Sequence, residues 1–206
     1  MINTPRCSRG WVFAVMLVLC ACASPKISME GDFPIPLVNP YPVTVGWLLD
    51  EKLLSYTHSE KVDRGGEWVI KVGAVQQGMF DSLSKGMFKE HVFLKEAKAE
   101  PSVNVIFVPS IEELQFSTPS QTRSKYFEVW IKYKFKMLNA DGSLRGEFPL
   151  TAYGKAHTQN YTVNTTSSAL EEATNAACRD AMAFFALQFR TLPPVKTWLD
   201  EKGLGG

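Results

Sequence analysis

The sequence predicts an α+β domain in which a mixed, largely antiparallel sheet is covered on one face by two main helices. Residues 126–138 alternate apolar and polar side chains, as a half-buried strand does. Residues 74–89 instead place their apolar side chains on one side of a helix, and an alanine-rich segment after residue 168 does the same. The 206 residues, 45% of them hydrophobic, are enough for one well-cored domain and exclude a disordered or collagen-like chain.

The first half of the domain is expected to contain short strands around one helix. These strands are expected at 43–49, 53–62 and 68–72, before the helix at 74–89, and at 91–94 and 103–108 after it. Val43–Leu49 is apolar almost throughout, so it belongs inside the sheet. The strand at 126–138 is followed by turn residues at 139–142 and by a returning antiparallel strand at 146–158.

The closing helix is expected between Ser168 and Pro193. Its apolar stripe contains many alanines, which permit a close approach to a sheet, and the stripe includes Cys178. Cys178 is the one cysteine after residue 22, so it has no partner for a disulfide within the domain. In an oxidising compartment such a thiol is either buried or held for an intermolecular disulfide, and the place of Cys178 in the stripe favours burial. Residues 195–201 are expected to form one further helical turn.

The N-terminus has the pattern of an export signal. Arg6 and Arg9 precede an uninterrupted apolar run at 11–19, about half the roughly 20 residues that a membrane-spanning helix needs. Small residues and a cysteine follow the run. Residues 1–21 are therefore predicted to be a signal peptide that is removed.

The end of this signal resembles the lipobox of bacterial lipoproteins. Leu19, Cys20, Ala21 and Cys22 place a leucine three residues before, and a small residue one before, the cysteine that such proteins acylate. The resemblance implies that Cys22 carries the lipid and becomes the new N-terminus. Cys20 fits less well, because the bulky Leu19 would occupy the small-residue position. The alternative is an ordinary secretory signal followed by a chance cysteine.

Residues 22–42 are predicted to be a lipidated N-terminus and a proline-rich tether, because they contain five prolines and few periodic apolar residues. Residues 43–200 would then form a single periplasmic domain, and 201–206 a flexible tail. Loss of residues 1–21 leaves 20 Lys and Arg against 21 Asp and Glu, a net charge of −1. The lipid rather than bulk charge is therefore expected to hold the protein to the membrane.

Lipobox, tether, small α+β domain and alanine-rich closing helix together resemble the YajG-type outer-membrane lipoproteins. They are more distantly similar to the domain shared by the curli-secretion and Pel-polysaccharide lipoproteins. The resemblance implies a non-enzymatic part in envelope assembly or export, often as an oligomeric ring, so a homo-oligomer is among the expected partners. Ala23 and Ser24, with no Asp after Cys22, resemble the sorting signal of outer-membrane lipoproteins and imply a periplasm-facing protein in that membrane.

The sequence contains no motif for catalysis, metal binding or nucleotide binding. His58, His91 and His157 stand singly, HEXXH, paired CXXC and GXSXG motifs are absent, and the glycine pair at 65–66 lacks the spacing of a phosphate cradle. The formal net charge of +1 argues against nucleic-acid binding. We expect no enzyme, metal or cofactor. An envelope hydrolase using carboxylates such as Glu112 and Glu113 is the minority alternative.

The outward side of the strand at 126–138 is the candidate binding surface. It combines Tyr126 and Trp130 with Lys132, Lys134 and Lys136. Lysines on a strand also keep an exposed sheet soluble, which is the simpler interpretation. As a contact surface, tryptophan beside cationic side chains would suit an acidic partner protein or an anionic glycan. The sequence therefore favours an accessory that acts through envelope proteins, with a glycan- or lipid-binding module as the alternative.

Overall fold

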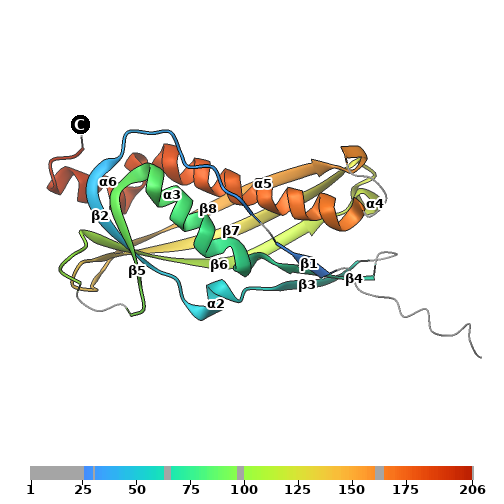
Figure 1. Ribbon diagram of the computed structural model, residues 1–206, viewed down its shortest axis with the longest axis horizontal. Helices are drawn as coiled ribbons and strands as arrows, with labels where there is room; N and C mark the ends of the chain where they lie inside the picture. The colour runs from blue at the N-terminus through green and yellow to red at the C-terminus, as the bar shows by residue number, and fades with distance from the viewer. Residues whose placement is uncertain (1–25, 30, 63–65, 97–99, 161–164, 206) are drawn as a thin grey trace, which may run out of the picture.

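The computed structural model describes residues 26–29, 31–62, 66–96, 100–160 and 165–205. Within them the main sheet has five strands (Figure 1), in the order β5 (Phe88–Leu94), β2 (Tyr41–Leu48), β6 (Val105–Ser117), β7 (Tyr126–Asn139) and β8 (Leu144–His157). The β2 strand runs parallel to both β5 and β6, whereas β6, β7 and β8 are antiparallel. The predicted α+β class and mixed sheet are confirmed.

Two helices cover one face of this sheet, as predicted. The α5 helix (Thr165–Gln188) lies along β7 and β8, and α3 (Gln76–Met87) packs beside it near β5 (Figure 1). The close approach of α5 requires Gly154 on β8, because a Cβ atom there would meet the backbone of Ala173 and Ala177. Asp180 on α5 also accepts a hydrogen bond from the Tyr153 backbone N–H at 2.9 Å, so the helix satisfies a polar group at the edge of the sheet.

The remaining elements are short. They are α2 (Glu51–Leu54), α4 (Pro119–Thr122) and α6 (Pro193–Glu201), with 3₁₀ turns at Val72–Val75, Thr158–Asn160 and Phe189–Thr191. The sequence predicted a strand over 53–62, but its first part is helical. The Asp50 side chain accepts a hydrogen bond from the Leu53 N–H at 2.8 Å and caps α2, so the strand begins only at His58.

A second sheet of three strands packs against one end of the first. It has the order β1 (Lys26–Ser28), β4 (Gly66–Lys71) and β3 (His58–Val62), with β1 parallel and β3 antiparallel to β4. The β1 strand lies inside the segment predicted as a tether, and Met29 and Phe33 after it are buried. The packed region of the described chain thus begins at Lys26, where the sequence predicted that the domain starts at residue 43.

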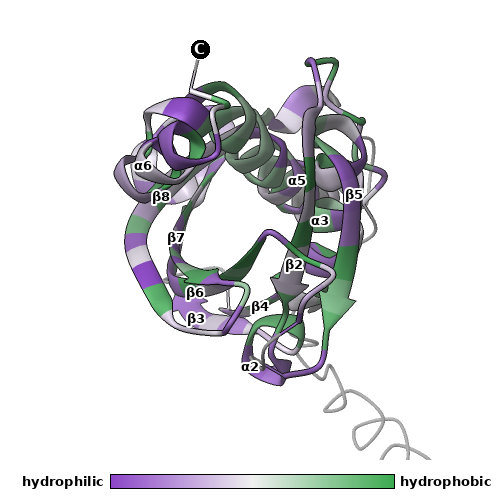
Figure 2. Cartoon of the chain, turned by 90° about the vertical axis from the view of Figure 1, so that its left-hand side faces the viewer, coloured by the Kyte–Doolittle hydropathy of each residue, from purple (hydrophilic) through white to green (hydrophobic). Residues whose placement is uncertain are grey.

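The main core lies between the sheet and the two helices, whose ribbons enclose it in Figure 2, and is rich in aromatic rings. Trp47 on β2 stacks on Phe80 of α3 with ring centroids 4.6 Å apart and lies 5.8 Å from Phe185 of α5. The Trp47 indole N–H donates to Ser84 Oγ at 2.6 Å, which satisfies a buried donor. Cys178 is also buried, as predicted, and burial raises the pKa of its thiol to about 12.

The β6 strand extends nine residues beyond the predicted end at 108, to Ser117. Two features conceal it in the sequence. The first is Pro109, because a proline is rare inside a strand. Here it lies beyond the three residues of β6 that pair with β2, so no hydrogen bond to β2 is lost. A bulge between Ile111 and Glu113 then breaks the alternation and leaves Glu112 and Glu113 both exposed.

Candidate functional site

The strand β7 separates two faces as its alternation predicted. The side chains of Phe127, Val129, Ile131, Tyr133, Phe135 and Met137 are buried. The intervening positions, Trp130 and the three lysines among them, lie on the opposite side of the sheet. We call the outward side chains of β6, β7 and β8 around Trp130 the contact face. Trp130 is 36% exposed, whereas Trp47, Trp68 and Trp198 are buried.

Trp130 is paired across the sheet with an aromatic partner. Tyr153 on β8 lies directly opposite it in register, and the two ring centroids are 5.2 Å apart. The Tyr153 hydroxyl donates to Glu128 Oε1 at 2.6 Å, and Glu128 Oε2 accepts from Ser117 at 3.2 Å. The hydrogen bond to the Glu128 carboxylate, with a smaller effect of burial, raises the pKa of Tyr153 to about 12. This network holds the tyrosine ring beside the tryptophan.

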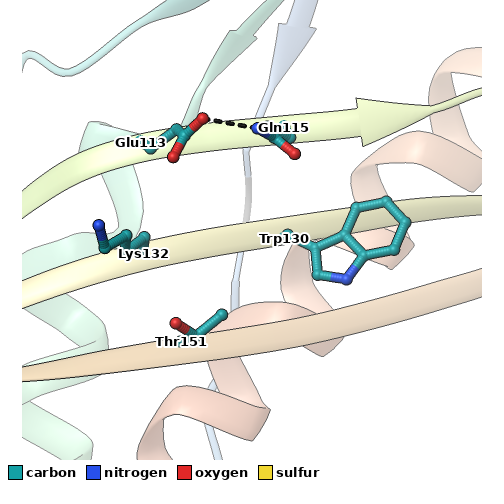
Figure 3. A pocket seen from close by; sticks show the side chains of 5 residues that line it. All are labelled: Glu113, Gln115, Trp130, Lys132 and Thr151. Carbon is teal, nitrogen blue, oxygen red and sulfur yellow. Dashed lines mark hydrogen bonds between the residues drawn. The ribbon is translucent and has the colours of Figure 1, made fainter.

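A shallow hollow of about 260 Å³ opens beside Trp130. Figure 3 shows that side chains from three neighbouring strands line it: Glu113 and Gln115 from β6, Trp130 and Lys132 from β7, and Thr151 from β8. The Gln115 side-chain N–H donates to Glu113 Oε1 at 2.6 Å. The hollow thus offers one aromatic ring together with carboxylate, amide, ammonium and hydroxyl groups, which suits a polar ligand or a polar protein surface.

The lysines of the contact face pair with glutamates, and sequence analysis did not predict this pairing. Lys132 Nζ lies 3.2 Å from Glu112 Oε2, and Lys134 Nζ lies 2.6 Å from Glu147 Oε2. The hydrogen bond between the latter pair raises the pKa of Lys134 and lowers that of Glu147. The contact face is therefore of mixed charge rather than cationic. The alternation of β7 reveals the lysines, but only the register with β6 and β8 reveals their partners.

Two of the predicted residues lie at the margins of the contact face. Tyr126, at the start of β7, packs edge-on against His157 with ring centroids 4.9 Å apart, and Lys155 Nζ lies 5.2 Å from its ring centroid. Lys136 is exposed and faces Glu147 in register. Neither side chain lines the hollow beside Trp130. Of the predicted residues, Trp130 and Lys132 thus line the hollow, and Lys134 lies two residues farther along β7, outside it.

The other histidines have local partners. His58 Nε2 lies 3.2 Å from Glu60 Oε2, and His91 Nε2 lies 2.9 Å from Asp81 Oδ1. A hydrogen bond from Lys85, more than the one from His91, lowers the pKa of Asp81. Over residues 26–205, apart from the gaps given above, no three His, Cys, Asp or Glu side chains converge in a way that could hold a metal ion.

A second surface, which the sequence did not indicate, is apolar. Residues 34–36 and Val38 form with α5 a hollow of about 260 Å³, whose α5 lining includes Met182, Ala186 and Leu187. Leu37 is 100% exposed and Leu187 is 73% exposed. We call this surface the apolar groove.

The lipobox residues Leu19, Cys20, Ala21 and Cys22 lie outside the described residues. No helix among the residues that the structure describes has the length and apolar character needed to span a membrane.

No protein-family model matches the chain, and no curated protein matches it. Among solved structures, it is similar to a Xanthomonas campestris protein at 11% identity, with a TM-score of 0.46 over 86% of this chain and 95% of the other. It is also similar to a minor lipoprotein from Acinetobacter baumannii at 12% identity, with a TM-score of 0.38 over 73% of this chain and 92% of the other. These likenesses to bacterial proteins, one of them a lipoprotein, assign neither a family nor a function to this chain.

Proposed function

We propose that this protein is a lipoprotein anchored in the outer membrane, facing the periplasm, that acts without catalysis as an accessory in assembly, export or maintenance of the cell envelope. It works through protein contacts made by the contact face. The anchor is supported by the sequence: Arg6 and Arg9, the short apolar run and the lipobox ending at Cys22. One acyl chain binds membranes only marginally, so stable attachment requires the several chains that bacterial lipoproteins carry.

The observation that carries the contact proposal is the exposed Trp130 beside a fixed Tyr153. Tryptophan and tyrosine are enriched among the few residues that carry most of the binding energy of protein interfaces, because they bury much apolar area and lose little conformational entropy. Here the tyrosine is held by Glu128, so part of that ordering already exists in the free protein. The ion pairs beside it, from Lys132 and Lys134, supply the polar rim of such an interface.

Complementation of a deletion strain tests both the lipid anchor and the contact face. Growth of the strain in detergent and bile salts reports on the envelope. Wild type should restore it, whereas Cys22→Ala should fail because the anchor is lost, and Trp130→Ala should fail with normal protein levels. Phe184→Ala is the matched control, because Phe184 is 37% exposed but lies on α5. Full rescue by Trp130→Ala would contradict the contact proposal, and full rescue by Cys22→Ala would contradict the anchor.

The alternative is a binding module for a glycan. The hollow beside Trp130 favours it, because Gln115, Glu113 and Thr151 place hydrogen-bonding groups next to an aromatic ring. After removal of the signal peptide, Trp130 is the single exposed tryptophan among the four that remain. Quenching of fluorescence by iodide therefore reports on this site. Envelope glycan fragments that protect the wild type from quenching, and fail to protect Thr151→Val, would favour the glycan over the protein partner.

A further inference from the structure

We infer that one end of the domain faces the bilayer: the end formed by α4, the start of β7 and the end of β8. This inference rests on the proposed lipid anchor at Cys22. Only residues 23–25 separate Cys22 from Lys26, the first residue of β1. Four residue steps of at most about 3.6 Å give a reach of about 14 Å. The surface around β1 must therefore lie close to the lipid headgroups.

The position of β1 in the fold decides which end this is. Lys26 pairs with Val69 of β4, and the neighbouring Trp68 packs against Phe127, at the start of β7, with ring centroids 5.8 Å apart. Trp68 also lies 6.2 Å from Phe116, near the end of β6. The anchor point thus lies beside the end of the sheet where α4 joins β6 to β7, at the right of Figure 1.

The opposite end is out of reach of the anchor. The β8 strand runs from Leu144 to His157, about 43 Å at the usual rise of a strand. The turn between β7 and β8 therefore lies about three times farther from the anchored end than the roughly 14 Å that residues 22–26 can span. The contact face lies between the two ends, because Trp130 is four residues, or about 13 Å, from Tyr126.

The charge of the anchored end fits a membrane surface. Residues 118–127 and 154–160 contain Arg123, Lys125, Lys155 and His157 but no Asp or Glu. The next residue of β7, Glu128, lies opposite Lys155 in register and accepts hydrogen bonds from Tyr153 and Ser117, so it offsets only part of this positive charge. The two segments lie side by side, since Thr158 N–H donates to the Lys125 carbonyl at 3.0 Å. Arg123, Lys125 and Lys155 are exposed. A local basic surface within reach of the anchor is attracted to anionic headgroups, although the mature chain as a whole has a net charge of −1.

The apolar groove is the competing membrane-facing surface. Leu37 and Leu187 are strongly exposed there, and a domain lying on its α5 side would insert them into the bilayer. The anchor geometry favours the basic end, because Leu37 follows Lys26 by eleven residues, whereas β1 pairs directly with β4, whose Trp68 packs against Phe127 at the start of β7.

The test uses the full lipidated protein in vesicles of phosphatidylethanolamine and phosphatidylglycerol. A spin label is attached singly through Gln159→Cys at the anchored end, Leu144→Cys at the far end, or Leu187→Cys in the apolar groove. Cys178 is buried, so it does not compete for the label. A relaxation agent fixed to the lipid headgroups should enhance relaxation several-fold more at 159 than at 144 or 187. The largest enhancement at 144 or 187 would overturn the inference.

Further measurements distinguish failure of the lipid anchor from failure of the proposed orientation. The mass of each reconstituted protein is measured first, and a protein without lipid at Cys22 would contradict the proposed anchor as well as this inference. Insertion of about 20 Gly and Ser residues after Ser24 adds a coil of about 25 Å, so the difference between 159 and 144 should shrink. Arg123→Glu with Lys125→Glu should reduce it too, whereas Lys196→Glu with Lys202→Glu, at the other end, should not. A difference that persists through both changes would contradict the inference.

Discussion

The aromatic side chains on the two faces of β7 make similar ring contacts but differ in how far they are buried. On the inner face, Phe135 packs against Phe148 and Phe185 at ring-centroid distances of 5.1 and 5.3 Å, and its position follows from burial alone. On the outer face, Trp130 packs against Tyr153 at a similar 5.2 Å yet remains 36% exposed. Similar ring contacts thus contribute to the core on one side and leave a surface available for binding on the other.

The largest expected effect is the loss of an inner ring. Phe135→Ala should lower the free energy of unfolding by about 3–5 kcal/mol, because it removes buried area and leaves a cavity. Trp130→Ala, the matched change on the outer face, should lower it by about 1 kcal/mol or less. Denaturation by urea measures both. Equal losses for the two variants would show that Trp130 is a structural residue and would remove the distinction between the faces.

Gly154→Ala should have the next largest effect. The added methyl group meets the backbone of α5, which cannot yield as a side chain can, so we expect a loss of about 1–3 kcal/mol. Gly78→Ala is the control, because Gly78 lies in α3 and a Cβ atom there would meet nothing within 4 Å. It should stabilise the protein by about 0.5–1 kcal/mol. Unchanged stability of Gly154→Ala would contradict the close packing of α5 on β8.

The ion pair on the contact face should affect stability only slightly, and in a pH-dependent way. The folded protein lowers the pKa of Glu147, chiefly through its hydrogen bond with Lys134. The pair therefore stabilises the fold above the pKa of a free glutamate, and this contribution is lost as the pH falls through the lowered value. Any difference in Tm between wild type and Glu147→Gln should be small at neutral pH and vanish in acid. A difference that grows in acid would contradict the pairing.

The smallest effect is spectroscopic. Glu128→Gln removes the carboxylate that raises the pKa of Tyr153 to about 12, so one tyrosine should titrate at lower pH than in the wild type. Absorbance of tyrosinate across an alkaline titration measures this. Gln115→Glu, on the same face, is a control for general charge effects. An unchanged titration in Glu128→Gln would show that Tyr153 is not fixed as described.

The sequence predicted the elements whose pattern is local and long. In β7, α3 and α5 one side of the element is buried. Apolar residues therefore recur at every second position of the strand and at every turn of the helices. By contrast, β1 has three residues and exists through its pairing with β4, and α2 depends on a single cap at Asp50. Neither carries a repeating signal.

The candidate site likewise contains residues that a local pattern predicts and contacts that it does not. Trp130, Lys132 and Lys134 were predicted because they occupy the outward positions of one strand. The ion pairs that Glu112 and Glu147 form with these lysines were not predicted, because they depend on a bulge in β6 and on the register of β8. Such contacts join residues far apart in the chain, so no local pattern records them. The mixed charge of the contact face is therefore a property of the sheet rather than of any one strand.

The most direct test of the proposed function is cross-linking in living cells from a photoreactive amino acid placed at position 130. Position 184, of nearly equal exposure, is the control. We predict a discrete membrane-associated adduct from 130 that is absent from 184, with twice the mass of the protein if the partner is a second copy. No adduct from 130, or the same adduct from both positions, would contradict the proposal that the outer face of β7 is where this protein binds its partner.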